Sequence, residues 1–278
     1  MRIVETRGVK LATESFGSPD KGTILLVMGA TASMVWWPLS FCQALAAGGY
    51  QVIRFDLRDT GQSTTGQPGK VDYDVTELAH DLLAILNAYD ARSAHVVGMS
   101  LGGMLSQIAA LTQPDRVQTL TLIASEPLGM TYEAEGMSED FMAHFATMEH
   151  LDWSDRTAVA AFMFRIAELS AGSAPPFDAG SARARIAKEL DRTANIQSAF
   201  NHAQLAGKLD PALTAAGITQ PVLVIHGTED PIIAFAAAET LVAAIPNADL
   251  LTLDRRGHDL PVQDLPRISD AILNFLAG

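Results

Sequence analysis

The chain has 278 residues, of which 48% are apolar and 18% are charged. This composition excludes a disordered chain and is typical of a globular protein with a large core. Asp and Glu outnumber Lys and Arg by 32 to 19, and the resulting net charge of −13 argues against a nucleic-acid partner, which requires a basic face.

Cysteine usage and the N-terminal residues indicate the compartment. The single cysteine, Cys42, cannot form an internal disulfide, so folding does not depend on an oxidising environment. Residues 1–8 lack the apolar run of a secretion signal and are predicted to form a strand. Charged residues, Pro or Gly interrupt every Ala-rich stretch before the ~18 residues that a membrane span needs. We therefore expect a cytoplasmic protein without a membrane partner; nothing in the sequence specifies its oligomeric state.

Apolar runs of strand length alternate with longer helical patterns along the first 125 residues. Strands are predicted at 23–28, 50–55, 94–99 and 117–124. Helices are predicted at 37–47, 74–89 and 101–112. In the second of these helices, apolar residues recur every three or four positions, which is the pattern of a helix packed on a sheet.

The same alternation returns near the C-terminus. Strands are predicted at 221–226 and 249–253, and helices at 235–245 and 261–276. Uninterrupted apolar strands are typical of parallel sheets that are covered on both faces by helices. The sequence therefore predicts an α/β fold with a doubly wound, mostly parallel sheet, whose core domain consists of residues 1–125 and 218–278.

Residues 126–217 interrupt this pattern and contain no strand-like run. Helical patterns occupy 138–150, 154–170, 178–191 and 194–206, which predicts an inserted helical cap over 126–217. Met and aromatic residues are frequent here, and they either pack the cap onto the core or line an apolar ligand pocket. Together with one residue from the first long strand, the residues predicted to line such a pocket are Met28, Met130, Phe141, Met142, Phe145, Trp153 and Phe162.

A Gly-x-Ser-x-Gly motif lies where the predicted strand 94–99 turns into the next helix. It consists of Gly98, Met99, Ser100, Leu101 and Gly102. A serine on such a strained turn leaves no room for side chains beside it, which explains the flanking glycines. The turn places the serine hydroxyl at the carboxyl edge of the sheet, next to a helix N-terminus that stabilises negative charge. Ser100 is therefore the predicted nucleophile.

A serine nucleophile needs a histidine base and a carboxylate that orients it, here in the chain order Ser, acid, His. Asp230 and His258 both follow predicted strands late in the chain, at the sheet edge where ligand sites form. Glu229 and Asp259 are the competing carboxylates, and His226 is the competing base, although it precedes the acid. The other histidines lie in predicted helices, or at the start of a strand, and fit less well: His80, His95, His144, His150 and His202.

Two backbone N–H groups are expected to form an oxyanion hole. Leu101 follows the nucleophile and provides one of them. The second is expected from the loop after the strand 23–28, where Gly29 allows the chain to pass close to Ser100 and Ala30 is the predicted donor.

The whole chain resembles a serine α/β-hydrolase with a helical cap, and within that superfamily it is most similar to the aclacinomycin methylesterase type. The segments that carry the narrower likeness are 26–29, 52–65, 94–100, 222–225, 230–232 and 257–261. The resemblance implies hydrolysis of a methyl ester on a polyketide-like aromatic substrate, with Ser100, Asp230 and His258 as the triad. Asp56 and Arg58, in the second segment, are predicted to hold backbone in place rather than to contact substrate.

We therefore predict a carboxylic ester hydrolase that acts on a small-molecule ester without a cofactor. No spacing of His, Asp or Glu indicates a metal site, and the glycines at 98–103 do not follow the dinucleotide-binding pattern. Serine at position 100 excludes the dehalogenase mechanism, which uses a carboxylate nucleophile. The same triad also serves lactonases, carbon–carbon bond hydrolases and cofactor-free perhydrolases, and a non-catalytic binding protein on this scaffold is the remaining alternative.

Overall fold

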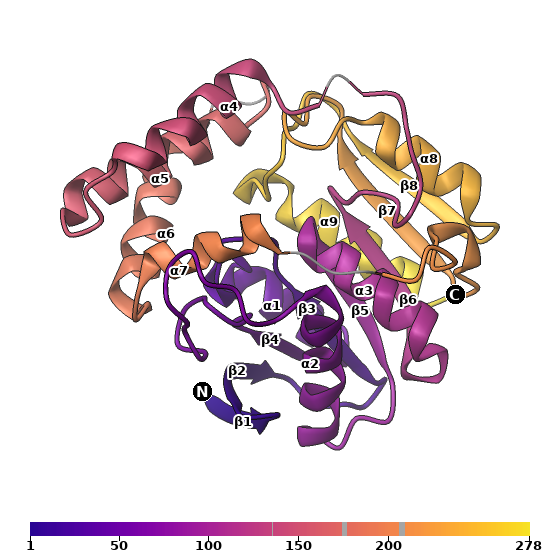
Figure 1. The fold of residues 1–278 in the computed structure, drawn as a ribbon. Helices are drawn as coiled ribbons and strands as arrows, with labels where there is room; N and C mark the ends of the chain where they lie inside the picture. Colours follow the sequence, from indigo (N-terminus) through magenta and orange to yellow (C-terminus); the bar gives the residue numbers. More distant parts are fainter. Residues whose placement is uncertain (135, 174–176, 206–208) are drawn as a thin grey trace.

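The computed structural model describes residues 1–134, 136–173, 177–205 and 209–278. Within these residues, eight strands form one twisted sheet in the order β1–β2–β4–β3–β5–β6–β7–β8 (Figure 1). Their bounds are β1 (Arg2–Thr6), β2 (Val9–Phe16), β3 (Thr23–Val27), β4 (Gln51–Phe55), β5 (Ala94–Met99), β6 (Val117–Ile123), β7 (Val222–Gly227) and β8 (Ala248–Leu253).

The six strands from β4 to β8 in the sheet order pair in parallel, whereas β2 pairs antiparallel with both β1 and β4. The prediction of a doubly wound, mostly parallel sheet is thus confirmed. Strand β2 was not predicted, because charged residues interrupt its apolar pattern. One of them, Glu14, lies opposite Arg54 of β4 and forms an ion pair with it at 2.6 Å, which fixes the antiparallel register.

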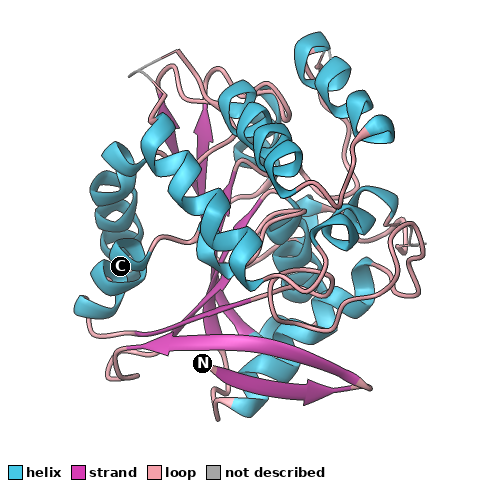
Figure 2. Cartoon of the chain, turned by 90° about the vertical axis from the view of Figure 1, so that its left-hand side faces the viewer, coloured by secondary structure: helices cyan, strands magenta, loops and turns pink. Residues whose placement is uncertain are grey.

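Helices cover both faces of the sheet, as Figure 2 shows in the view turned by 90°. On one face lie α1 (Leu39–Ala47) and α9 (Leu265–Leu276), and on the other α2 (Val75–Ala88), α3 (Leu101–Thr112) and α8 (Ala236–Ala244). Strand β3 shows the division residue by residue. Its Leu25 packs with α2 and α3, whereas the neighbouring Ile24 packs with α1 and α9, because successive side chains of a strand point to opposite faces.

The chain between β6 and β7 is helical, and its described residues contain no strand. It contains α4 (Glu139–Ala146), α5 (Arg156–Ser170), α6 (Ala179–Arg192) and α7 (Ile196–Ala199), which Figure 1 shows beside the sheet rather than on its faces. Helices α5 and α6 share a small apolar cluster of their own, which includes Met163 and Ile186. Of the predicted helix 194–206, position 206 lies outside the described residues.

Helix α6 is joined by buried polar contacts to residues that follow strands of the sheet. Glu189 accepts hydrogen bonds from the Ser33 hydroxyl at 2.5 Å and from the Trp36 indole N–H at 3.1 Å. One turn further on, Arg192 forms an ion pair with Asp56 at 2.7 Å. These contacts fix α6 against the loops that follow β3 and β4. None of the helices in the described parts of the chain has both the length and the apolar character needed to cross a membrane.

Candidate active site

Ser100 occupies the sharp turn between β5 and α3 with φ 51° and ψ −119°, a strained conformation for a residue with a side chain. The glycines on either side make this turn possible. A Cβ on Gly98 would lie 2.3 Å from the Gly102 carbonyl oxygen, and a Cβ on Gly102 would lie 2.1 Å from that of Val27. The Ser100 N–H donates to the Ile123 carbonyl of β6 at 2.9 Å, which ties the turn to the sheet.

Asp230 and His258 meet at the same edge of the sheet, after β7 and β8. The Asp230 Oδ2 atom lies 2.8 Å from His258 Nδ1. The other oxygen of Asp230 accepts the backbone N–H groups of Ile232 and Ile233 at 2.9 and 2.8 Å, so the carboxylate is held at both ends. The His258 backbone N–H donates to the Ser170 carbonyl of α5 at 2.7 Å.

The charge of Asp230 determines which nitrogen of the His258 imidazole carries the proton. Burial by itself would raise the pKa of Asp230, but the charge and hydrogen bonds of His258 and His226 outweigh it and hold that pKa below its ordinary value. An ionised carboxylate only accepts hydrogen bonds, so Nδ1 of His258 carries the proton. Nε2 is then left free to accept a proton from a neighbouring group.

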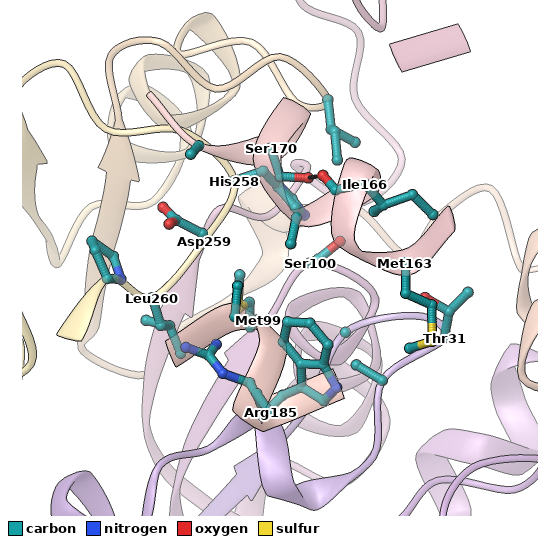
Figure 3. Close-up of a pocket in the computed structure, with 18 of the residues that line it drawn as sticks. Thr31, Met99, Ser100, Met163, Ile166, Ser170, Arg185, His258, Asp259 and Leu260 are labelled. Carbon is teal, nitrogen blue, oxygen red and sulfur yellow. Dashed lines mark hydrogen bonds between the residues drawn. The ribbon is translucent and has the colours of Figure 1, made fainter. Parts of the chain in front are cut away.

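His226 contacts the same carboxylate from inside the protein. Its Nε2 lies 3.3 Å from Asp230 Oδ2 and donates to the Ile233 carbonyl at 2.8 Å. Its side chain is fully buried and is absent from the cavity wall. His226 therefore supports Asp230, whereas His258 lines the cavity together with Ser100 (Figure 3). Ser100 Oγ forms no hydrogen bond with another described residue, and His258 lies on the same cavity wall.

The loop after β3 passes directly beside the serine. A Cβ on Gly29 would lie 3.3 Å from Ser100 Cβ, so only a small residue fits here. Ala30 lines the cavity, and the backbone N–H groups of Ala30 and Leu101 have no acceptor among the described residues. These are the two predicted oxyanion donors.

His202, which the sequence analysis set aside, holds this loop in place. Its Nδ1 accepts the Thr31 N–H at 3.1 Å, and its Nε2 lies 2.8 Å from the Arg58 carbonyl. The Nδ1 atom accepts, so Nε2 carries the proton and donates to Arg58. Burial lowers the pKa of His202, which keeps the ring neutral as this arrangement requires. Sequence position gave no signal for this role, because His202 follows α7 and is 171 residues from Thr31.

A cavity of about 360 Å³ opens beside Ser100, a volume within the usual range for small-molecule sites. Of the predicted pocket residues, Met28, Phe141 and Phe145 line it. Phe141 and Phe145 are four residues apart in α4 and share one helix face, on which their rings stack.

The other four predicted pocket residues lie away from the cavity wall. Met142 lies on α4 beside Phe141 but is 51% exposed. Met130 packs against the core of the sheet domain, and Trp153 and Phe162 pack around the ring of Phe200. Composition identified the right kind of residue, but it does not specify which face of a helix points into a cavity.

Several cavity residues were missed by the sequence analysis. They are mostly apolar and come from both sides of the site: Trp36, Met99, Met163, Ile166, Phe200, Ile232 and Leu260. The charged residues Asp178, Arg185, Arg256 and Asp259 also line the wall. Met99 and Asp259 are sequence neighbours of the predicted catalytic residues, and this adjacency was the available signal. Among the described residues, no group of three or more His, Cys, Asp or Glu side chains is arranged to hold a metal ion.

The family described as the alpha/beta hydrolase fold matches residues 22–264, and the chain therefore belongs to this family. Over 134 residues it is 41% identical to rhodomycin D methylesterase DauP of Streptomyces sp. (strain C5). That segment is 48% of this chain and 45% of the relative, so the match spans less than half of either protein. The putative carbamate hydrolase RutD of Caulobacter segnis is 27% identical over 95% of this chain and 96% of its own length.

Among solved structures, an esterase from Exiguobacterium antarcticum aligns over 99% of this chain and 98% of its own, with a TM-score of 0.80 and 19% identity. At this identity the likeness shows a shared fold. The resemblance to the alpha/beta hydrolase family and to methylesterases, predicted from the motifs, is confirmed.

Proposed function

We propose that this protein is a carboxylic ester hydrolase in which Ser100 is the nucleophile, His258 the base and Asp230 the residue that orients it. The observation that carries the proposal is the joint position of the three residues. Ser100 lies on a strained turn at a cavity that His258 also lines, and the buried Asp230 carboxylate fixes the imidazole at 2.8 Å.

In this mechanism Ser100 Oγ attacks the ester carbonyl carbon while His258 Nε2 takes the hydroxyl proton. The N–H groups of Leu101 and Ala30 stabilise the oxyanion of the tetrahedral intermediate. The intermediate expels the alcohol, which leaves with the proton from His258, and an acyl-enzyme on Ser100 remains. Water then attacks the acyl group by the same steps, releasing the carboxylic acid and restoring the serine.

We further propose that the helical segment 126–217 is a cap on a core domain formed by residues 1–125 and 218–278. Helices α4, α5 and α6 all contribute side chains to the cavity beside Ser100, and most of these are apolar. A pocket of this kind accommodates an apolar or aromatic acyl group. The partial match to rhodomycin D methylesterase supports a methyl ester as the substrate, with methanol as the leaving group.

Hydrolysis of an ester panel tests the proposed function. The panel contains p-nitrophenyl esters from acetate to octanoate and methyl esters of aromatic acids. Wild type is expected to hydrolyse them, and Ser100→Ala to lose at least roughly a thousandfold in kcat because the nucleophile is gone. Ser18→Ala is the matched control, since Ser18 is exposed and, among the described residues, its hydroxyl bonds to Asp20 alone. Wild-type turnover in Ser100→Ala would contradict the proposal.

A further inference from the structure

Charged side chains interrupt the apolar wall of the cavity beside Ser100, namely Asp178, Arg185, Arg256 and Asp259. Asp178 accepts a hydrogen bond from Ser181 at the start of α6, and Arg256 forms an ion pair with Asp264, which leaves Arg185 and Asp259. Arg185 of α6 and Asp259, the residue after His258, are both drawn in Figure 3. Arg185 is half-buried and its guanidinium lies over the Trp36 ring, 5.0 Å from the centroid. It forms no hydrogen bond and no ion pair within 4 Å with any described residue. Asp259 Oδ1 is buried and equally without a hydrogen-bond partner there.

The two charges influence each other without forming a close pair. Burial lowers the pKa of Arg185, and the charges of Asp259 and Asp178 oppose this effect. Burial also raises the pKa of Asp259 to about 6, although Arg185 and Arg256 act in the opposite direction. A guanidinium presents five N–H donors in a planar fork, and leaving them unpaired in an apolar cavity is costly. Those donors are therefore available to a molecule that occupies the cavity.

Resting on the proposed function, we propose that Arg185 is a specificity-determining residue that binds an oxygen acceptor, a carbonyl or a carboxylate, on the acyl part of the substrate. The substrate class is then an aromatic or apolar ester that carries a second oxygen group away from the scissile bond. The apolar wall binds the body of the acyl group, and the N–H groups of Arg185 donate hydrogen bonds to its polar end. Trp36 supports the guanidinium from the other side, and α6 is anchored by Glu189 and Arg192.

Three methyl esters of similar size test this assignment. Methyl para-isopropylbenzoate has no acceptor, methyl para-acetylbenzoate has a carbonyl, and monomethyl terephthalate has a carboxylate. A second series of the corresponding naphthoate esters places each group further from the scissile bond. For each variant, kcat/KM of an acceptor ester is divided by that of the isopropyl ester. The electronic effect of the substituent is the same in every variant, so it cancels when this ratio is compared with that of wild type. Arg185→Gln is expected to reduce this ratio roughly tenfold to a hundredfold, mainly through KM. A larger loss for the carboxylate identifies an anionic substrate, and a larger loss for the acetyl group a neutral one.

Arg183→Gln is the matched control. Arg183 lies on the same helix, its guanidinium is 3.9 Å from the Phe164 ring centroid, and it is exposed rather than part of the cavity wall. Its substitution should leave the ratio unchanged. Arg185→Lys keeps the charge without the planar fork and should give an intermediate ratio. An unchanged ratio in Arg185→Gln, in either series, would overturn the inference.

A binding measurement separates this inference from the proposed function. Titration of the same three esters into Ser100→Ala, with and without Arg185→Gln, reports recognition without turnover. If wild type hydrolyses none of the esters, the proposed function fails, but weaker binding of the acceptor esters in the double variant still supports Arg185. If hydrolysis occurs and the second substitution leaves the affinities unchanged, only the inference about Arg185 fails.

Discussion

The turn that gives Ser100 its positive φ requires very small neighbours at three positions. Gly98, Gly102 and Gly29 each lie against backbone or against the serine itself. The closest approach is at Gly102, where α3 meets the carbonyl that ends β3. The sequence motif is thus a packing requirement at the point where a strand, a helix and a neighbouring loop converge.

Gly102→Ala is expected to destabilise the fold by about 3 kcal/mol or more, because the added Cβ would lie 2.1 Å from the Val27 carbonyl oxygen, and rigid backbone cannot yield cheaply. Urea unfolding followed by circular dichroism measures the change. Gly180→Ala, near the start of α6, is the control: its Cβ would meet only Asp178 Oδ1 at 3.4 Å, and it should be neutral or slightly stabilising. Equal stability of Gly102→Ala and wild type would contradict this account of the turn.

Asp230 contacts two histidines that differ in their position relative to the cavity. Both imidazoles approach its Oδ2 atom, at 2.8 Å for His258 and 3.3 Å for His226. Chain order favoured His258 as the base, and the structure places only His258 on the cavity wall. His226 donates its proton to a backbone carbonyl and is positioned to support the acid.

Helix α6 is the element that connects the cavity to the sheet domain. Along one side it carries Arg185 toward the cavity, then Glu189 against Ser33 and Trp36, then Arg192 against Asp56. The spacing of four and three residues keeps all three on one helix face. Glu189 is fully buried, and its Oε1 has no hydrogen-bond partner among the described residues. The helix therefore holds a carboxyl group in an environment that disfavours its charge.

This environment predicts a pH-dependent contribution to stability. Burial raises the pKa of Glu189 from 4.5 to about 7, although hydrogen bonds from Ser33 lower it in part. Between these two values the folded protein binds a proton that the unfolded chain has released, so Glu189 stabilises the fold at low pH and this contribution falls as pH rises toward 7. The total change is about 3 kcal/mol, from 1.36 kcal/mol per pKa unit.

Glu189→Gln cannot titrate, so its stability should fall less than that of wild type between pH 5 and pH 8. Unfolding free energies from urea denaturation at both pH values give the comparison. Glu149→Gln, at an exposed position, should follow wild type. A Glu189→Gln protein with the full wild-type pH dependence would show that this carboxyl group does not titrate in the fold as described.

At the scale of the whole molecule, the features predicted from the sequence are those that depend on interactions between neighbouring residues. The apolar runs of the parallel strands and the turn at Ser100 are properties of adjacent residues, and they were predicted directly. Strand β2 was not, because its stability comes from pairing with β4 and from the Glu14–Arg54 ion pair. His202 and Arg185 were also missed, since their roles arise from contacts with Thr31 and with a cavity that only the folded chain forms.

The helical segment 126–217 also has local features that were predicted and long-range features that were not. Its helices were predicted from their periodicity, but the orientation of α4 and α5 about their axes was not. Phe162 and Met163 are adjacent in α5, and the structure turns Met163 into the cavity and packs Phe162 against Phe200. A rotation of one residue exchanges such roles, and sequence periodicity is too coarse to fix it.

Covalent labelling of the serine tests the central claim of this account most directly. A fluorophosphonate reacts with an activated serine by losing fluoride and forming a phosphonate ester on Oγ, and intact mass followed by peptide mapping locates it. Wild type is expected to gain one adduct, on the peptide that contains Ser100. Ser100→Ala should gain none, and His258→Ala should react much more slowly because no base takes the proton. An unlabelled wild-type protein, or an adduct that persists in Ser100→Ala, would contradict the assignment of Ser100 as the nucleophile.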